Sequence, residues 1–123
     1  MISKYLQRCG LELTPEELKK ASRARRNCNC GNLKYTSLTK ELGATNKDPQ
    51  NFCIFPTYEI GFNALCQFIK LAAENKLKAY HNCNLYGFFA VYSPTGELLS
   101  KHYAEKVAKK VGVLPTDKLL SII

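Results

Sequence analysis

Apolar residues recur along the C-terminal half of the chain at spacings that predict helices. Over residues 58–75 they fall every three or four positions, as on one buried helix face. The segment 85–92, LYGFFAVY, is apolar all round, which predicts a short and largely buried helix. The segment 98–112 is amphipathic. The first face consists of Ile60, Ala64, Leu65, Phe68, Ile69 and Ala72, and the last of Tyr103, Val107 and Val111.

Capping residues predict where these helices begin and end. Thr57 and Asn84 precede the first two helices, and their side-chain oxygens can accept hydrogen bonds from the first N–H groups. Gly112 is expected to end the third helix. Thr116 is expected to cap a last helical turn. We therefore expect three helices and a short final turn after residue 57.

The N-terminal part predicts a basic helix over about residues 15–26. Thr14 is the expected N-cap, Pro15 takes the first helical position, and Glu17 completes a capping box. Between Leu18 and Lys40 the chain has no acidic residue and seven basic ones, within a net charge of +8. We expect a basic face that attracts nucleic acid, an anionic wall polymer or an acidic protein, and charge alone does not choose among them.

Two short segments predict strands. Residues 32–38, NLKYTSL, alternate in polarity, and residues 52–55, FCIF, end at a proline. A polar loop joins them, so we expect a small β-hairpin lobe. The predicted fold class is therefore α+β, mostly α. Its single domain has a basic helical segment over 1–26, the hairpin lobe over 27–56 and a helical core over 57–123.

The turn between the basic helix and the first strand, NCNCGNLKYT, has two cysteines one residue apart. Gly31 is expected to form a turn whose backbone is bonded by Asn27, Asn29 and Asn32. Zinc sites normally separate paired ligands by two or more residues, so a site formed by Cys28, Cys30, His81 and Cys83 is only a weak alternative. We expect no metal and no cofactor.

The N-terminal sequence and the apolar runs indicate where the protein is located, and its location determines the expected state of the cysteines. Lys4, Arg8 and Glu12 interrupt the first apolar residues, so no secretion signal is expected. The apolar runs are far shorter than the roughly 20 residues that span a bilayer, so no membrane partner is expected. The six cysteines are then expected to be mostly reduced, with Cys66 buried in its helix.

Four blocks in order resemble a small domain of phages, prophages and some bacteria: NCNCGNLKYT, NFCIFPTYEIGFNAL, LYGFFAVYSP and HYAEKVAKKVGV. That domain has an N-N-N-P-G-N turn followed by Ile or Leu, a basic residue and Tyr, and its members are commonly described as phage structural or virion proteins. The block order is also similar to that of flagellar-type glucosaminidases. This resemblance implies a lysozyme-like fold with the two predicted strands at the edge of a sugar-binding cleft.

The resemblance and the basic face together lead to one preferred function and two alternatives. The chain is expected to be a non-catalytic, virion-associated structural protein, such as a minor capsid, cement or internal component, located in the virion or the host cytoplasm. Its partners would be other virion proteins. A lysozyme-like peptidoglycan hydrolase, or an inactive wall-binding descendant, is the alternative, with Glu17 as the candidate acid. A nucleic-acid-binding protein is the third hypothesis. The expected binding residues are Arg23, Arg25, Arg26, Asn27, Asn29, Asn32, Lys34, Tyr35 and Tyr58.

Overall fold

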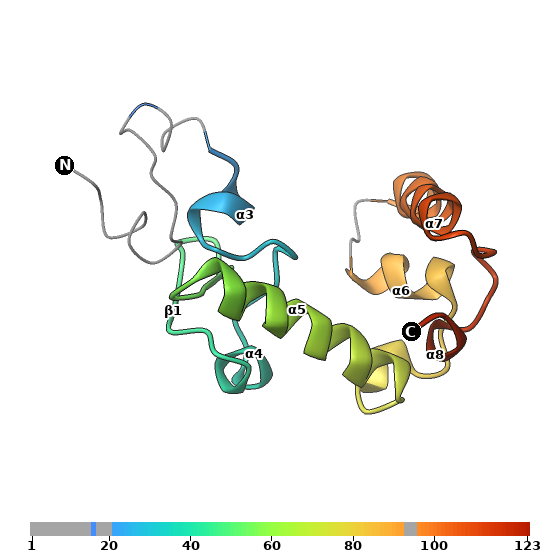
Figure 1. The fold of residues 1–123 in the computed structure, drawn as a ribbon, viewed down its shortest axis with the longest axis horizontal. Coiled ribbons are helices and arrows are strands. Elements are labelled where there is room, and N and C mark those ends of the chain that lie inside the picture. The colour runs from blue at the N-terminus through green and yellow to red at the C-terminus, as the bar shows by residue number, and fades with distance from the viewer. Residues whose placement is uncertain (1–15, 17–20, 93–95) are drawn as a thin grey trace. The chain divides into compact units, whose positions relative to one another are not determined.

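The computed structural model describes residue 16 and residues 21–92 and 96–123. The chain divides into two compact units, residues 1–67 and 68–123. The boundary falls inside helix α5 (Tyr58–Ala73), so each unit contains part of this helix (Figure 1). The described residues are mostly helical and contain one two-stranded antiparallel hairpin. This confirms the predicted α+β, mostly α class.

The first unit contains helix α3 (Arg23–Arg26). Ser22 precedes it in an extended conformation, and its hydroxyl accepts a hydrogen bond from the N–H of Arg25. The continuous helix predicted over 15–26 is therefore wrong at residue 22, because a serine hydroxyl that bonds a nearby N–H favours a helix start over a helix interior. The predicted cap residues Thr14, Pro15 and Glu17 lie outside the described residues.

Helix α4 (Ser37–Glu41) occupies the end of the predicted strand 32–38. Thr36 forms a capping box with Thr39, in which each side chain bonds the other residue's backbone N–H. This reciprocal pair starts a helix and ends the extended backbone. Only Lys34 of the predicted strand forms a bridge, which pairs it with Phe52.

The hairpin is formed by β1 (Asn46–Lys47) and β2 (Cys53–Ile54). Asn46 pairs with Ile54 and Lys47 with Cys53. The second strand agrees with the prediction, whereas the first lies within the segment predicted as a loop. The core of this unit gathers beneath the hairpin and the first half of α5, and consists of Cys28, Leu33, Ala44, Cys53, Ile54, Phe55 and Ala64.

Helix α5 begins as predicted, with the hydroxyl of Thr57 accepting a hydrogen bond from Ile60 N. Its buried face includes Ala64 and Ala72, but Ile60 is partly exposed. Cys66 is exposed, so the prediction that it is buried is wrong.

The second unit contains a 3-10 turn η1 (Lys78–Tyr80) and helices α6 (Leu85–Tyr92), α7 (Glu97–Val111) and α8 (Leu119–Ile122). Asn84 caps α6 through a bond from Gly87 N, and Gly112 ends α7 in the left-handed conformation, both as predicted. The residue before α8 is Lys118, so Thr116 is not its cap.

The core of the second unit is rich in aromatic rings. Tyr80 and Tyr92 both pack on the buried ring of Phe88, with centroid distances of 5.2 Å and 5.0 Å. Helix α7 packs here through a buried row of small residues, Ser100, Ala104 and Ala108. Helix α6 is buried on one side only, since Val91 is exposed. In the described part of the chain, no helix is both long and apolar enough to cross a membrane.

Candidate binding site on the first unit

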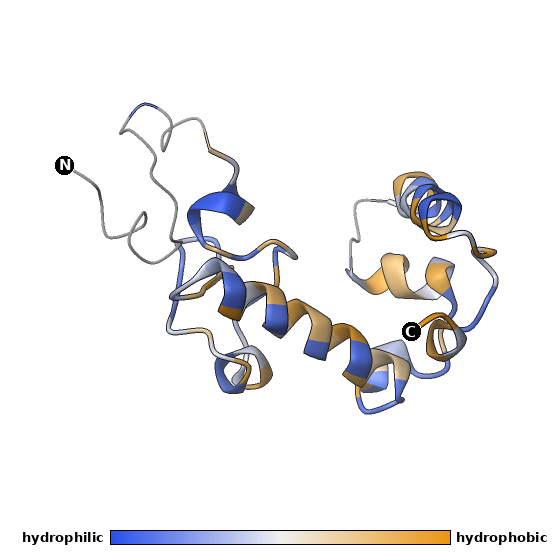
Figure 2. Cartoon of the chain, viewed as in Figure 1, coloured by the Kyte–Doolittle hydropathy of each residue, from blue (hydrophilic) through white to orange (hydrophobic). Residues whose placement is uncertain are grey.

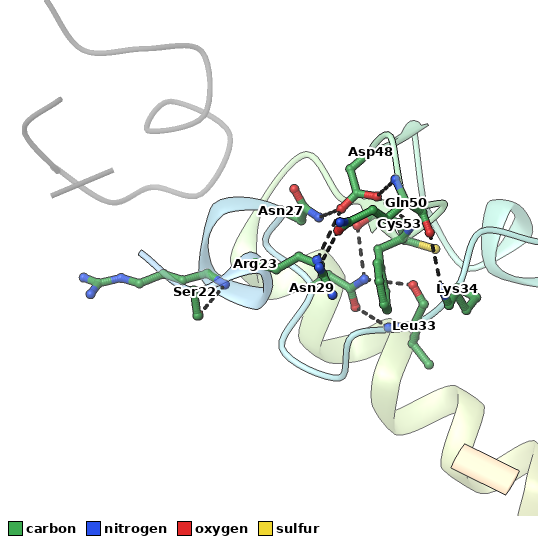
Figure 3. Close-up of polar contacts among 11 residues, drawn as sticks. Ser22, Arg23, Asn27, Asn29, Leu33, Lys34, Asp48, Gln50 and Cys53 are labelled. Carbon is green, nitrogen blue, oxygen red and sulfur yellow. Dashed lines mark hydrogen bonds and ion pairs between the residues drawn. The ribbon is translucent and has the colours of Figure 1, made fainter. Parts of the chain in front are cut away.

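Asn29 joins the turn after α3 to the hairpin and is fully buried. Its side-chain oxygen accepts a hydrogen bond from Leu33 N at 2.9 Å. Its side-chain nitrogen donates to Leu33 O at 3.0 Å and to Cys53 O at 3.1 Å (Figure 3). Because amide groups can both donate and accept, one buried side chain satisfies three backbone groups on two segments. This confirms that Asn29 bonds the turn's backbone, as the sequence predicted.

Asn27 is also buried, but its side chain donates to the carboxylate of Asp48 at 2.9 Å instead of to the turn. Asp48 also accepts from the N–H groups of Gln50 and Phe52, and Arg23 Nε lies 3.8 Å from it (Figure 3). Burial by itself raises the pKa of the Asp48 carboxyl, but these donors outweigh it and hold the pKa below its ordinary value. Asp48 is therefore an ionised, fully bonded group that organises the lobe.

Acidification is expected to remove the contribution of Asp48 to stability. Since its folded pKa is depressed, this contribution is present above the unfolded pKa of about 4 and is lost as the pH falls through the lower folded value. At pH 7, Asp48→Asn should lower the free energy of unfolding by about 2 kcal/mol. Urea unfolding followed by circular dichroism at pH 7 and in acid measures both effects.

The difference between wild type and Asp48→Asn should shrink as the pH falls. Glu41→Gln, which neutralises an exposed carboxylate of the same unit, should change stability by no more than about 0.5 kcal/mol. A difference between wild type and Asp48→Asn that stays constant down to the lowest pH would contradict this role of the carboxylate.

Arg23 and Lys34 lie on the ring of Phe52, and we call these three residues the Phe52 clamp. The guanidinium carbon is 4.3 Å and the ammonium nitrogen 3.8 Å from the ring centroid. Both cations are also bonded to Gln50: Arg23 donates to the side-chain oxygen, and Lys34 to the backbone oxygen at 3.2 Å. Cation–π contacts and hydrogen bonds thus hold two positive groups together at the surface.

A pocket of about 370 Å³ lies beside α3 and its N-cap residue. Tyr58 contributes a half-exposed ring that stacks with Phe62, at a centroid distance of 6.3 Å. Arg25 also lines the pocket. Burial raises the pKa of the Cys30 thiol in this pocket, so the sulfur stays protonated and is a weak nucleophile. The lining is mostly apolar, so the pocket is better suited to an apolar group than to an anion. Its lining consists of Ser22, Ala24, Arg25, Cys30 and Tyr58.

All of the predicted binding residues belong to this unit, but they do not form one cluster. Arg23 and Lys34 meet at the Phe52 clamp, whereas Arg25 and Tyr58 line the pocket. Lys47 lies 5.9 Å from the ring centroid of Tyr35. The remaining predicted residues have other places in the unit: Arg26 belongs to α3, Asn27 and Asn29 are structural, and Asn32 has a φ of 48° in the turn. Glu17 lies outside the described residues.

Sequence reasoning missed the roles of Asp48, Gln50 and Phe52. Asp48 lies in the segment that the sequence predicts as a polar loop between the two strands. The available signal was the sequence D-P-Q-N, because an Asp before a turn commonly accepts bonds from the N–H groups that follow it. Gln50 and Phe52 carried no comparable signal, since their contacts with Arg23 and Lys34 depend on tertiary pairing.

The cysteines of the weak metal alternative are separated in the structure. Cys28 is disulfide-bonded, so it cannot act as a thiolate ligand. Cys30 belongs to the first unit, whereas His81 and Cys83 belong to the second. Within residues 16, 21–92 and 96–123, no three His, Cys, Asp or Glu side chains are grouped as metal ligands. The four thiols described as free are Cys30, Cys53, Cys66 and Cys83.

Comparison of the chain with protein-family models, with curated proteins and with solved structures finds no match. The resemblance to a phage domain therefore depends only on the order of its sequence blocks. The lysozyme-like part of the fold prediction stays a prediction.

Proposed function

We propose that this chain is a non-catalytic, virion-associated structural protein that contacts acidic neighbours through the basic surface of its first unit. The observation that carries the proposal is the Phe52 clamp. Two cations of segments far apart in sequence, Arg23 and Lys34, are held on one ring and bonded to one glutamine. Because their positions are already restricted, less side-chain entropy is lost when an anion binds them.

The surroundings of the clamp also support binding rather than acid catalysis. Asp48, the carboxylate beside Arg23, has a lowered pKa and accepts three hydrogen bonds, so it does not carry a proton to donate near neutral pH. Arg25, from the same short helix as Arg23, lines the neighbouring pocket. These features favour a surface that recognises negative charge.

Reversing the charge of the clamp should prevent assembly. We expect wild-type protein to be recovered in purified virus particles at a fixed ratio to the major capsid protein, as measured by quantitative mass spectrometry. Lys34→Glu should lower this ratio by about tenfold, because it places a like charge against an acidic neighbour. Lys40→Glu, an exposed change of the same charge on α4, is the control and should leave the ratio within about twofold.

Two results would overturn the proposal. The first is absence of the wild-type protein from purified particles. The second is equal loss of Lys34→Glu and Lys40→Glu, which would show that total charge matters and the clamp does not. If the protein is absent from particles and binds duplex DNA with a steep salt dependence that Lys34→Glu reduces, the nucleic-acid hypothesis replaces this one.

A further inference from the structure

Helix α7 exposes large apolar side chains on a face that the rest of the described part of the second unit leaves largely uncovered, although Val107 is partly buried. Leu99, Tyr103, Val107 and Val111 recur every four residues, beside the buried row of small residues that faces α6. Leu98 is 69% exposed, Leu99 54%, Tyr103 52% and Val111 56%. We call Leu99, Tyr103, Val107 and Val111 the α7 stripe. Hydrophobic and hydrophilic positions lie side by side along this helix (Figure 2). Apolar side chains gathered in this way mark an interaction site more often than scattered ones do.

The stripe has a fixed form on the helix surface. The ring of Tyr103 stacks on Phe89 of α6 with a centroid distance of 5.8 Å and an interplanar angle of 16°. This contact holds the centre of the stripe in place, although half of the tyrosine surface stays exposed. A partner would therefore meet a surface that is already ordered, which lowers the entropic cost of binding.

Two lysines border the α7 stripe on the side away from the buried row of small residues. Lys106 and Lys110 each precede a stripe residue by one position and are both exposed. Residues four apart lie on one helix face, so these two lysines form a basic edge that runs beside Val107 and Val111. A partner that buries the stripe will place its own flanking groups against this edge, and acidic groups are complementary to it.

A second copy of this chain fits the surface poorly. In a two-fold symmetric dimer whose α7 helices pack antiparallel, the same patch faces itself, which brings the lysine edge of one copy toward that of the other. Like charges placed opposite each other across an interface oppose association. The occupant that matches both features has an apolar face and acidic flanks.

We propose that the α7 stripe binds an acidic amphipathic helix of a partner protein. The apolar face of that helix packs on Leu99, Tyr103 and Val111, and its carboxylates lie against Lys106 and Lys110. This mode of recognition lays one helix along another through residues spaced by three and four. The surface belongs to the second unit and uses none of the residues of the Phe52 clamp, so this proposal does not depend on the proposed function.

Fluorescence anisotropy with a labelled synthetic peptide tests the proposal on the full chain. The peptide has the length of α7, 15 residues, with leucines at helical spacing and glutamates elsewhere. The wild-type protein should bind it and should not bind a peptide in which every glutamate is replaced by lysine. Leu99→Gln should weaken binding by about tenfold, because it removes an apolar contact. The double variant Lys106→Glu, Lys110→Glu should weaken it by a similar factor, because it removes the attraction between the lysines and the glutamates of the peptide.

A matched control lies on the same helix. Lys101→Glu with Lys109→Glu makes the same change of charge on the opposite side of α7 and should leave the affinity within about twofold. Circular dichroism shows whether each variant keeps its helices. Equal loss from the two double variants, unchanged binding by Leu99→Gln, or no binding by the wild-type protein overturns the proposal.

Two further measurements identify other occupants. Vesicles that contain phosphatidylglycerol, bound in a way that Leu99→Gln weakens while the peptide stays unbound, would show a lipid surface in place of a helix. A dimer in sedimentation equilibrium that Leu99→Gln dissociates would show a second copy of the chain. Either result overturns the proposal of an acidic partner.

Discussion

Gly61→Ala is expected to unfold the first unit. A Cβ at residue 61 would lie 1.8 Å from the carbonyl oxygen of Cys28, a distance that only a shift of backbone can relieve. Helix α5 would have to move away from the turn after α3, and the core beneath the hairpin would open. We expect a loss of at least about 3 kcal/mol in the free energy of unfolding. Urea unfolding followed by circular dichroism measures this loss.

The expected change in the free energy of unfolding has the opposite sign to that of the same substitution at an ordinary helix position. Glycine to alanine inside an exposed helix normally stabilises by about 1 kcal/mol. Gly87→Ala in α6 is the matched control, because its nearest neighbour is the Cβ of Cys83 at 3.2 Å, which a small adjustment relieves. We expect Gly87→Ala to change stability by no more than about 1 kcal/mol. Similar values for the two variants would contradict the close packing of Gly61 on the Cys28 carbonyl.

Asn29→Ala is expected to have the second largest effect, a loss of about 2–4 kcal/mol. The change removes three hydrogen bonds at a fully buried site and leaves Leu33 N without its acceptor. An unpaired buried N–H costs more than the bond itself contributes. Asn63→Ala, an exposed change on α5, should remain within about 0.5 kcal/mol of wild type.

Asn29→Asp separates the hydrogen bonds from the shape of the side chain. A carboxylate can still accept from Leu33 N, but it would face the carbonyl oxygens of Leu33 and Cys53, to which the amide donates. The folded pKa of this new carboxyl should therefore be raised, so that the variant gains stability relative to wild type as the pH falls. Urea unfolding at pH 7 and in mild acid measures this gain. If Asn29→Asp and wild type differ by the same amount at both pH values, the assigned bonding of the amide is wrong.

The helix starts were predictable because each depends on a few adjacent residues. The hydroxyl of Thr57 bonds Ile60 N, and Asn84 bonds Gly87 N, so four residues of sequence contain the whole interaction. The same local rule also holds at residue 22, where Ser22 caps α3 inside the segment predicted as one continuous helix. Thr116 shows a limit of predicting helix starts from local sequence, since a possible cap residue does not ensure that a helix follows it.

The presence of a hairpin could be predicted from the sequence, but the position of its first strand could not. Strand β1 consists of Asn46 and Lys47, two exposed polar residues with no alternation of polarity. Such a strand exists only because β2 offers backbone groups to pair with. The Phe52 clamp also depends on tertiary pairing, since Arg23 and Lys34 meet only when residues 34 and 52 form a bridge.

By itself, the sequence determined the helical character of the chain, the ends of its longer helices and its basic charge, because these depend on neighbours or on composition. Tertiary structure decided which face of each helix is buried. Periodicity selected Tyr103, Val107 and Val111 as one apolar face of α7, yet the helix packs on α6 through Ser100, Ala104 and Ala108. Small side chains allow two helices to approach closely, and whether they do so depends on the shape of the partner helix, which no local pattern contains.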